Sequence, residues 1–215
     1  MSIANKTNRI VKNAGLSLGL AAGLGAGFGA VVAAADPPAA LDGFERFVEQ
    51  DGDFNFDPAT AMRGLVHLGS YFVPKGDAAG FHHVYTQPGV PEAWRREGAF
   101  PDGTVLIKEI ATHRTADYTT GQGVASATEA RQWFVMIKDG GNRFPDHPLW
   151  GQGWGWALYK SDAPTTNVAR DYRLDCLGCH APARPNDWVY VEGYPALRAL
   201  RAAGEKTGPR SEIGK

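Results

Sequence analysis

The sequence contains no long run of basic residues, no internal repeat and, after its first 35 residues, no low-complexity linker. Because its 22 Lys and Arg residues are balanced by 23 Asp and Glu residues, neither nucleic acid nor an anionic membrane surface is indicated as a partner. Strand patterns do not alternate with long helices, which argues against a Rossmann-type sheet. Cysteine is also scarce, since the chain has only two and both lie in one short motif.

The N-terminus has the three parts of a secretory signal. Lys6, Arg9 and Lys12 precede an uncharged run rich in Ala, Gly, Leu and Val, which ends at Ala35 before Asp36. This pattern predicts a signal peptide over 1–35 and a periplasmic location. An uncleaved membrane anchor is the alternative, because the run is about as long as a short transmembrane span. Cleavage leaves one domain over 36–215 with a net charge of about −4. A domain of this size can form a single core.

The pattern of apolar residues predicts a β-dominated α+β domain, with mainly antiparallel strands and a few short helices. Helical spacing or an initial proline predicts helices over 40–50, Pro88–Glu97 and Pro195–Ala203. Alternating or β-branched residues predict strands over Gly64–Val73, Phe81–Tyr85, Val105–Ile110, Gln132–Lys138, Gly153–Tyr159 and Asp187–Val191.

The motif that carries chemistry is Cys176-Leu177-Gly178-Cys179-His180. In an exported protein this spacing is typical of covalent haem c attachment, in which two thiols bind the vinyl groups and the adjacent imidazole binds iron. The abundant aromatic residues, six Trp, seven Tyr and ten Phe, suit a protein that encloses a large flat ligand. We therefore expect one haem c, held by Cys176 and Cys179, with His180 as the iron ligand.

Two other interpretations of the cysteine pair are weaker. A disulfide between Cys176 and Cys179 would close a very small loop, and thioredoxin-like redox chemistry places this motif in a βαβ unit that the pattern lacks. A structural zinc site needs a second pair of ligands at short spacing, which is absent from the sequence.

The second axial position is predicted to be open. Candidate ligands are His67, His82, His83, His113, His147, Met62 and Met136. Met136 lies in a predicted strand, where packing is its expected role. His82 and His83 are adjacent on a strand, so at most one of them can face the core. None stands out as a sixth ligand, which favours a five-coordinate iron.

Four segments together resemble the cytochrome P-460 family: FPDGTVLIKEI at 100–110, WFVMIKD at 133–139, GQGWGWALY at 151–159 and the late CLGCH at 176–180. The similarity runs from about Gly64 to just beyond the haem motif. It implies an antiparallel β fold, commonly a homodimer, with a five-coordinate haem. The family includes hydroxylamine-oxidising enzymes, in which a lysine is cross-linked to the haem. It also includes the cytochromes c′-beta, which lack the cross-link and bind nitric oxide or carbon monoxide in an apolar pocket.

The resemblance makes Lys108 the best match for the cross-linking lysine, with Lys138 and Lys75 as weaker candidates. Alternation places Lys108 and Glu109 on opposite faces of one strand, and a buried lysine is costly unless it is paired or chemically altered. An exposed lysine on an edge strand is the alternative interpretation.

Hydroxylamine oxidation also requires a proton acceptor near the haem. Glu109, His82 and Asp139 are the candidates, and Glu109 is grouped with Lys108 as a catalytic residue. Phe81, Tyr85, Phe134, Trp154 and Trp156 are candidates for lining the pocket, with ordinary core packing as the alternative.

Whether the chain is an enzyme stays open at this point. The leading hypothesis is a periplasmic mono-haem oxidoreductase that oxidises hydroxylamine to nitric or nitrous oxide and passes electrons to a soluble periplasmic acceptor. The second is a non-catalytic protein of the cytochrome c′-beta kind that binds nitric oxide or carbon monoxide. A simple electron-transfer cytochrome is least favoured, because no convincing sixth ligand is present.

Overall fold

A computed structural model describes residues 41–198 and has one six-stranded antiparallel sheet with strand order β1-β2-β3-β4-β6-β5. The strands are β1 (Val66–Val73), β2 (Gly80–Thr86), β3 (Val105–Tyr118), β4 (Gly121–Lys138), β5 (Trp150–Gly151) and β6 (Trp154–Lys160). The predicted β-dominated α+β class is confirmed.

The helices are all short. They are α1 (Gly43–Phe47), α2 (Pro58–Ala61), α3 (Val90–Glu97), α4 (Tyr172–Asp175) and α5 (Leu177–His180), followed by the 3-10 turns η1 (Ala181–Asn186), η2 (Val191–Gly193) and η3 (Pro195–Leu197). None of the helices in the described part of the chain is long and apolar enough to cross a membrane. The predicted signal peptide lies outside the described residues.

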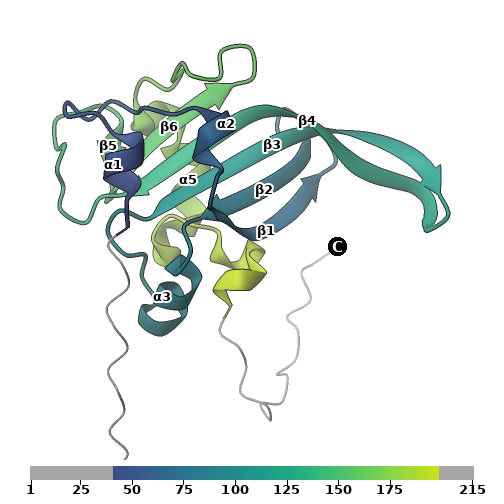
Figure 1. The fold of residues 1–215 in the computed structure, drawn as a ribbon, viewed down its shortest axis with the longest axis horizontal. Coiled ribbons are helices and arrows are strands. Elements are labelled where there is room, and N and C mark those ends of the chain that lie inside the picture. The colour runs from purple at the N-terminus through teal and green to yellow at the C-terminus, as the bar shows by residue number, and fades with distance from the viewer. Residues whose placement is uncertain (1–40, 199–215) are drawn as a thin grey trace, which may run out of the picture. The chain divides into compact units, whose positions relative to one another are not determined.

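Strands β3 and β4 form a hairpin longer than the rest of the sheet. β2 pairs with β3 only from Leu106 to Ala111, and β6 pairs with β4 only from Gln132 to Lys138. Beyond these ranges β3 and β4 pair with each other alone, and Figure 1 shows them running out past β1 and β2. The predicted strands therefore match the part of the hairpin that has neighbours and a core.

Each face of the sheet packs against a different set of segments. On one face, Val105, Ile107, Val135 and Ile137 pack with aromatic residues of the N-terminal segments, such as Phe47. On the other, apolar residues of β2, β3 and β4 pack with α3 and the C-terminal segment. This second cluster includes Val84, Leu106, Met136, Trp156, Cys176, Trp188 and Tyr194. The second face is the one that forms the candidate site.

Several predicted elements differ from the structure. The strand over Asp187–Val191 is wrong, because Asp187 and Trp188 have left-handed backbones with φ of 56° and 66°, and η2 follows. The helix over Pro195–Ala203 reduces to η3 within the described residues, and residues beyond 198 lie outside them. The helix over 40–50 shortens to α1, because Val48 is extended and forms a bridge with Phe54.

Candidate haem-binding site

The haem motif lies where two short helices meet. Cys176 ends α4 and precedes α5, and α5 carries Cys179 and His180. Residues three and four positions apart share one face of a helical turn. The spacing brings both cysteines and the imidazole close together, and both cysteines are free thiols, Cys176 buried and Cys179 exposed.

The motif borders two adjoining cavities of about 90 and 150 Å³. The cavities share five lining residues: Lys108, Phe134, Met136, Cys179 and His180. The first cavity is also lined by residues of β1, β2, β3 and the C-terminal segment, namely Tyr71, Val84, Leu106, Val189, Tyr190 and Tyr194. The second is closed by Ala78, His82, Ile110, Gln132, Val135, Trp156, Ala157, Asp175 and Cys176.

His180 is held in the tautomer that an iron ligand needs. Its Nδ1 lies 2.7 Å from the carbonyl oxygen of Trp188, and since a carbonyl only accepts, Nδ1 carries the proton. Nε2 is therefore left with a free lone pair. Trp156 packs edge-on against the ring, with 4.9 Å between ring centroids. Burial lowers the pKa of His180, although its bond to Trp188 opposes that shift.

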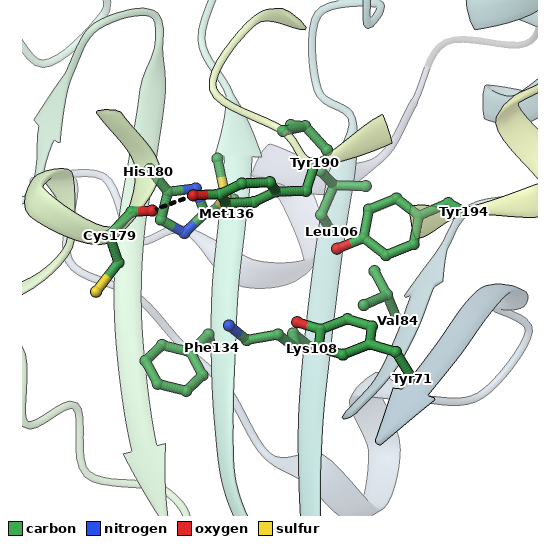
Figure 2. Close-up of a pocket in the computed structure, with 11 residues that line it drawn as sticks. Tyr71, Val84, Leu106, Lys108, Phe134, Met136, Cys179, His180, Tyr190 and Tyr194 are labelled. Carbon is green, nitrogen blue, oxygen red and sulfur yellow. Dashed lines mark hydrogen bonds between the residues drawn. The ribbon is translucent and has the colours of Figure 1, made fainter. Parts of the chain in front are cut away.

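A neighbouring hydrogen bond fixes the backbone of the motif. The hydroxyl of Tyr190 donates to the carbonyl oxygen of Cys179 at 2.7 Å. Figure 2 shows this bond, with His180 on the motif side and Lys108 and Phe134 reaching into the same space from the sheet. Free thiols, an imidazole with a free Nε2 and a largely apolar lining all suit a covalently bound haem.

Lys108 points into the cavity from β3. This strand lies inside the sheet, so the alternative of an exposed lysine on an edge strand is wrong. Its Nζ lies 4.4 Å from the ring centroid of Phe134, and no salt bridge among residues 41–198 involves it. Burial lowers the pKa of Lys108, and the nearby thiols of Cys179 and Cys176 oppose that shift. The amine is thus shifted toward its neutral form.

The three proton-acceptor candidates lie in different places. Glu109 is on the opposite face of β3 from Lys108, where its Oε2 accepts a hydrogen bond from Trp133 Nε1 at 3.1 Å. Asp139 accepts hydrogen bonds from Arg143 and does not line either cavity. Only His82 lines the second cavity.

His82 is 3% exposed. Its Nε2 lies 2.7 Å from the carbonyl oxygen of Ala78, so Nε2 donates and Nδ1 has the free lone pair. That Nδ1 is buried and has no hydrogen-bond partner among the described residues. Burial lowers the pKa of His82, and Lys108, Arg131 and His83 add to the shift, whereas its bond to Ala78 opposes it. His83 points to the other face, as the alternation predicts.

The remaining sequence-based candidates divide between the cavity and the core. Phe134 and Trp156 line the cavities, whereas Phe81, Tyr85 and Trp154 do not. Met136 is buried and lines both cavities. Lys138 forms an ion pair with Asp187. The sequence patterns missed Trp188, Tyr190 and Tyr194. The contribution of Trp188 is a backbone carbonyl, for which side-chain chemistry carries no signal.

The family model of Cytochrome P460 matches residues 63–191. The chain belongs to the cytochrome P460 family. It is accordingly a c-type cytochrome that binds haem and iron, and the match covers both the sheet and the CLGCH motif. No curated protein matches the chain.

Proposed function

We propose that this protein is an exported mono-haem oxidoreductase that oxidises hydroxylamine. One haem c would be held through Cys176 and Cys179, with His180 as the iron ligand and Lys108 bonded to the macrocycle. The observation that carries this proposal is the amine of Lys108, which lines the same cavities as Cys179 and His180. When bound, the haem would supply an iron that can bind the substrate nitrogen and accept its electrons.

The environment of Lys108 favours a bond over an ion pair. Its pKa is lowered by burial, and it has no carboxylate partner among the described residues. A neutral amine is a nucleophile, whereas an ammonium is not. Such a bond would replace one macrocycle C–H bond and one N–H bond by a C–N bond, and the two protons and two electrons released would require a two-electron oxidant of the peroxide class.

His82 is the proton acceptor in this proposal. Oxidation of one hydroxylamine to nitric oxide releases three protons and three electrons, and an acceptor near the haem speeds such a step. The free lone pair of His82 Nδ1 and the position of its ring on the second cavity support this role. Neither Glu109 nor Asp139 lines the cavities, so we assign them no part in proton transfer.

Export and partners are further parts of the proposal. The signal-like residues 1–35 support a periplasmic location, and the electrons then pass to a soluble periplasmic acceptor. We also propose a homodimer. Phe72 on β1 and Tyr118 on the β3–β4 hairpin are exposed, which supports self-association.

The test compares the wild type with Lys108→Met and, as a matched control, Lys160→Met on the exposed end of β6. The wild type should give a haem-stained band after denaturing electrophoresis, a red-shifted reduced Soret band, a haem peptide joined to the Lys108 peptide and hydroxylamine turnover. Lys108→Met should keep the stained band and lose the other three, while Lys160→Met keeps all four. A wild type without any stained band would contradict covalent haem binding altogether.

A gas-binding protein of the cytochrome c′-beta kind is the second candidate. The apolar lining of the first cavity, with Val84, Leu106, Phe134 and Met136, favours it. In that case the wild type would show an ordinary high-spin spectrum, rapid nitric oxide binding, no Lys108 linkage and no oxidation of hydroxylamine.

A further inference from the structure

The segment that accepts the hydrogen bond of His180 has an unusual backbone. Asp187 and Trp188 follow η1, and both have a left-handed conformation, with φ of 56° and 66°. Such a conformation is uncommon outside glycine, and for a bulky residue such as Trp it is an outlier. It persists only where the surrounding structure holds it. The carbonyl of Trp188, which accepts from Nδ1 of His180, is positioned by these two residues.

The contacts that hold this segment come from the ends of two strands. Lys138, the last residue of β4, places its Nζ 2.8 Å from the carboxylate of Asp187. Trp154, the first residue of β6, donates from Nε1 to the carbonyl oxygen of Asp187 at 3.0 Å. The Lys138 ammonium also lies 5.0 Å from the ring centroid of Trp154. Asp187 is thus held through both its side chain and its backbone.

This ion pair is shielded from water. The side chains of Lys138 and Asp187 are 16% and 25% exposed, whereas those of Arg143 and Asp102, a second pair near the same end of β4, are 41% and 44% exposed. Partial burial strengthens an ion pair and reduces its screening by salt. The Lys138–Asp187 pair is therefore a firm link between the sheet and the segment beside His180.

We propose that Lys138 is a positioning residue for the axial ligand: through Asp187 it fixes the Trp188 carbonyl that receives the Nδ1 proton of His180. This inference rests on the proposed role of His180 as the haem ligand. A hydrogen bond from Nδ1 raises the basicity of a ligating imidazole, and residues that orient such bonds tune the metal. A more basic imidazole favours ferric over ferrous iron, so the link lowers the reduction potential of the haem.

The test measures the midpoint potential and the Fe(II)–His stretching frequency of the haem-loaded protein. Lys138→Met removes the ammonium, and Asp187→Asn removes the charge while keeping an oxygen that accepts from Trp154. Lys138→Arg keeps the positive charge as a conservative variant. Arg143→Met is the matched control, because it breaks ion pairs with Asp102 and Asp139, neither of which contacts Asp187 or Trp188.

Lys138→Met should lower the stretching frequency and shift the ferric-to-ferrous ratio about tenfold toward ferrous, which corresponds to a potential about 59 mV higher for one electron. Asp187→Asn should shift both readings in the same direction, and Lys138→Arg should restore most of the wild-type values. Arg143→Met should change neither.

The inference is overturned if Lys138→Met and Asp187→Asn bind haem and give the wild-type potential and frequency. If Lys138→Met does not accumulate with haem, Asp187→Asn decides alone, since its bond from Trp154 is retained. Failure of the proposed function has a different signature, namely a wild type with no covalently bound haem.

Discussion

The two faces of β3 and β4 follow the same alternation of side chains but have different roles. Val105, Ile107 and Ile137 are completely buried against the N-terminal segments. At the alternate positions of the same two strands, Leu106, Lys108 and Phe134 face the cavities that border the haem motif. The sheet can therefore border cavities on one face, because the side chains packed on the other face hold the strands together.

The difference extends to polar groups. On the packed face, Glu109 accepts a hydrogen bond from Trp133 and lies across from His83. On the cavity face, within residues 41–198, Nδ1 of His82 has no hydrogen-bond partner and Lys108 forms no salt bridge. Buried polar groups are normally paired in folded proteins, and the exceptions call for an explanation. We take the unpaired groups on the cavity face as those that act on the cofactor and its ligand.

The largest expected effect comes from truncating the packed face. Ile107→Ala should lower the free energy of unfolding by about 2–5 kcal/mol, because it leaves a cavity among fully buried neighbours. Leu106→Ala, its neighbour on the other face, should lose less than about 2 kcal/mol, since Leu106 borders the cofactor cavity and is enclosed by packed side chains on fewer sides. Urea unfolding followed by circular dichroism measures both.

The haem spectrum gives the matching control for this pair. Ile107→Ala should leave the Soret band unchanged below its unfolding midpoint, whereas Leu106→Ala should shift it. Equal losses of stability together with equal spectra would contradict the division between a packed face and a cavity face.

A second prediction concerns the pH dependence of stability. The pKa of His82 is lower in the folded protein than its ordinary value of 6.5, mainly because of burial, with Lys108 and Arg131 adding to the shift. Between the folded pKa and 6.5 the unfolded chain binds more protons, so stability falls as the pH falls through this window. The slope is at most about 1.4 kcal/mol per pH unit, the limit for one proton.

The measurement is the urea unfolding free energy at several pH values, for the wild type and for His82→Gln. His82→Gln should flatten the dependence below pH 6.5 relative to the wild type. An unchanged slope in His82→Gln would show that the buried ring does not titrate in this way.

The sequence predicted most of the sheet because alternation is a local signal. Val105–Ile110 and Gln132–Lys138 form the parts of β3 and β4 that have neighbours on both sides, and there burial enforces the pattern. The outer hairpin was missed because its residues face solvent and show no alternation. The predicted strand at Asp187–Val191 is wrong because long-range contacts determine the backbone there. Trp188 accepts a hydrogen bond from His180, and Asp187 forms an ion pair with Lys138.

The sequence predicted site residues only where residue types and their spacing together indicate a function. The CLGCH motif identifies its own three residues, since their types and separations carry the function. Alternation placed Lys108 and Glu109 on opposite faces of the sheet, and likewise His82 and His83, but it did not show which face borders the cavities. That choice depends on the register between strands, in which Val84 pairs with Lys108 and His83 pairs with Glu109.

Glu109 gives the smallest expected effect and the sharpest test of that choice. Glu109→Gln should change stability by at most about 1 kcal/mol, because the amide oxygen can still accept from Trp133. Turnover with hydroxylamine and the Soret band should stay at wild-type values, since the side chain lies on the far side of the sheet from Lys108. His82→Gln should instead reduce turnover by about 10²-fold, the usual contribution of a positioned proton acceptor. Steady-state kinetics of the two variants therefore tests which residue accepts the proton: His82, which the strand register places on the cavity face, or Glu109, the sequence neighbour of Lys108. A larger loss of turnover in Glu109→Gln than in His82→Gln would reverse the assignment of the two faces.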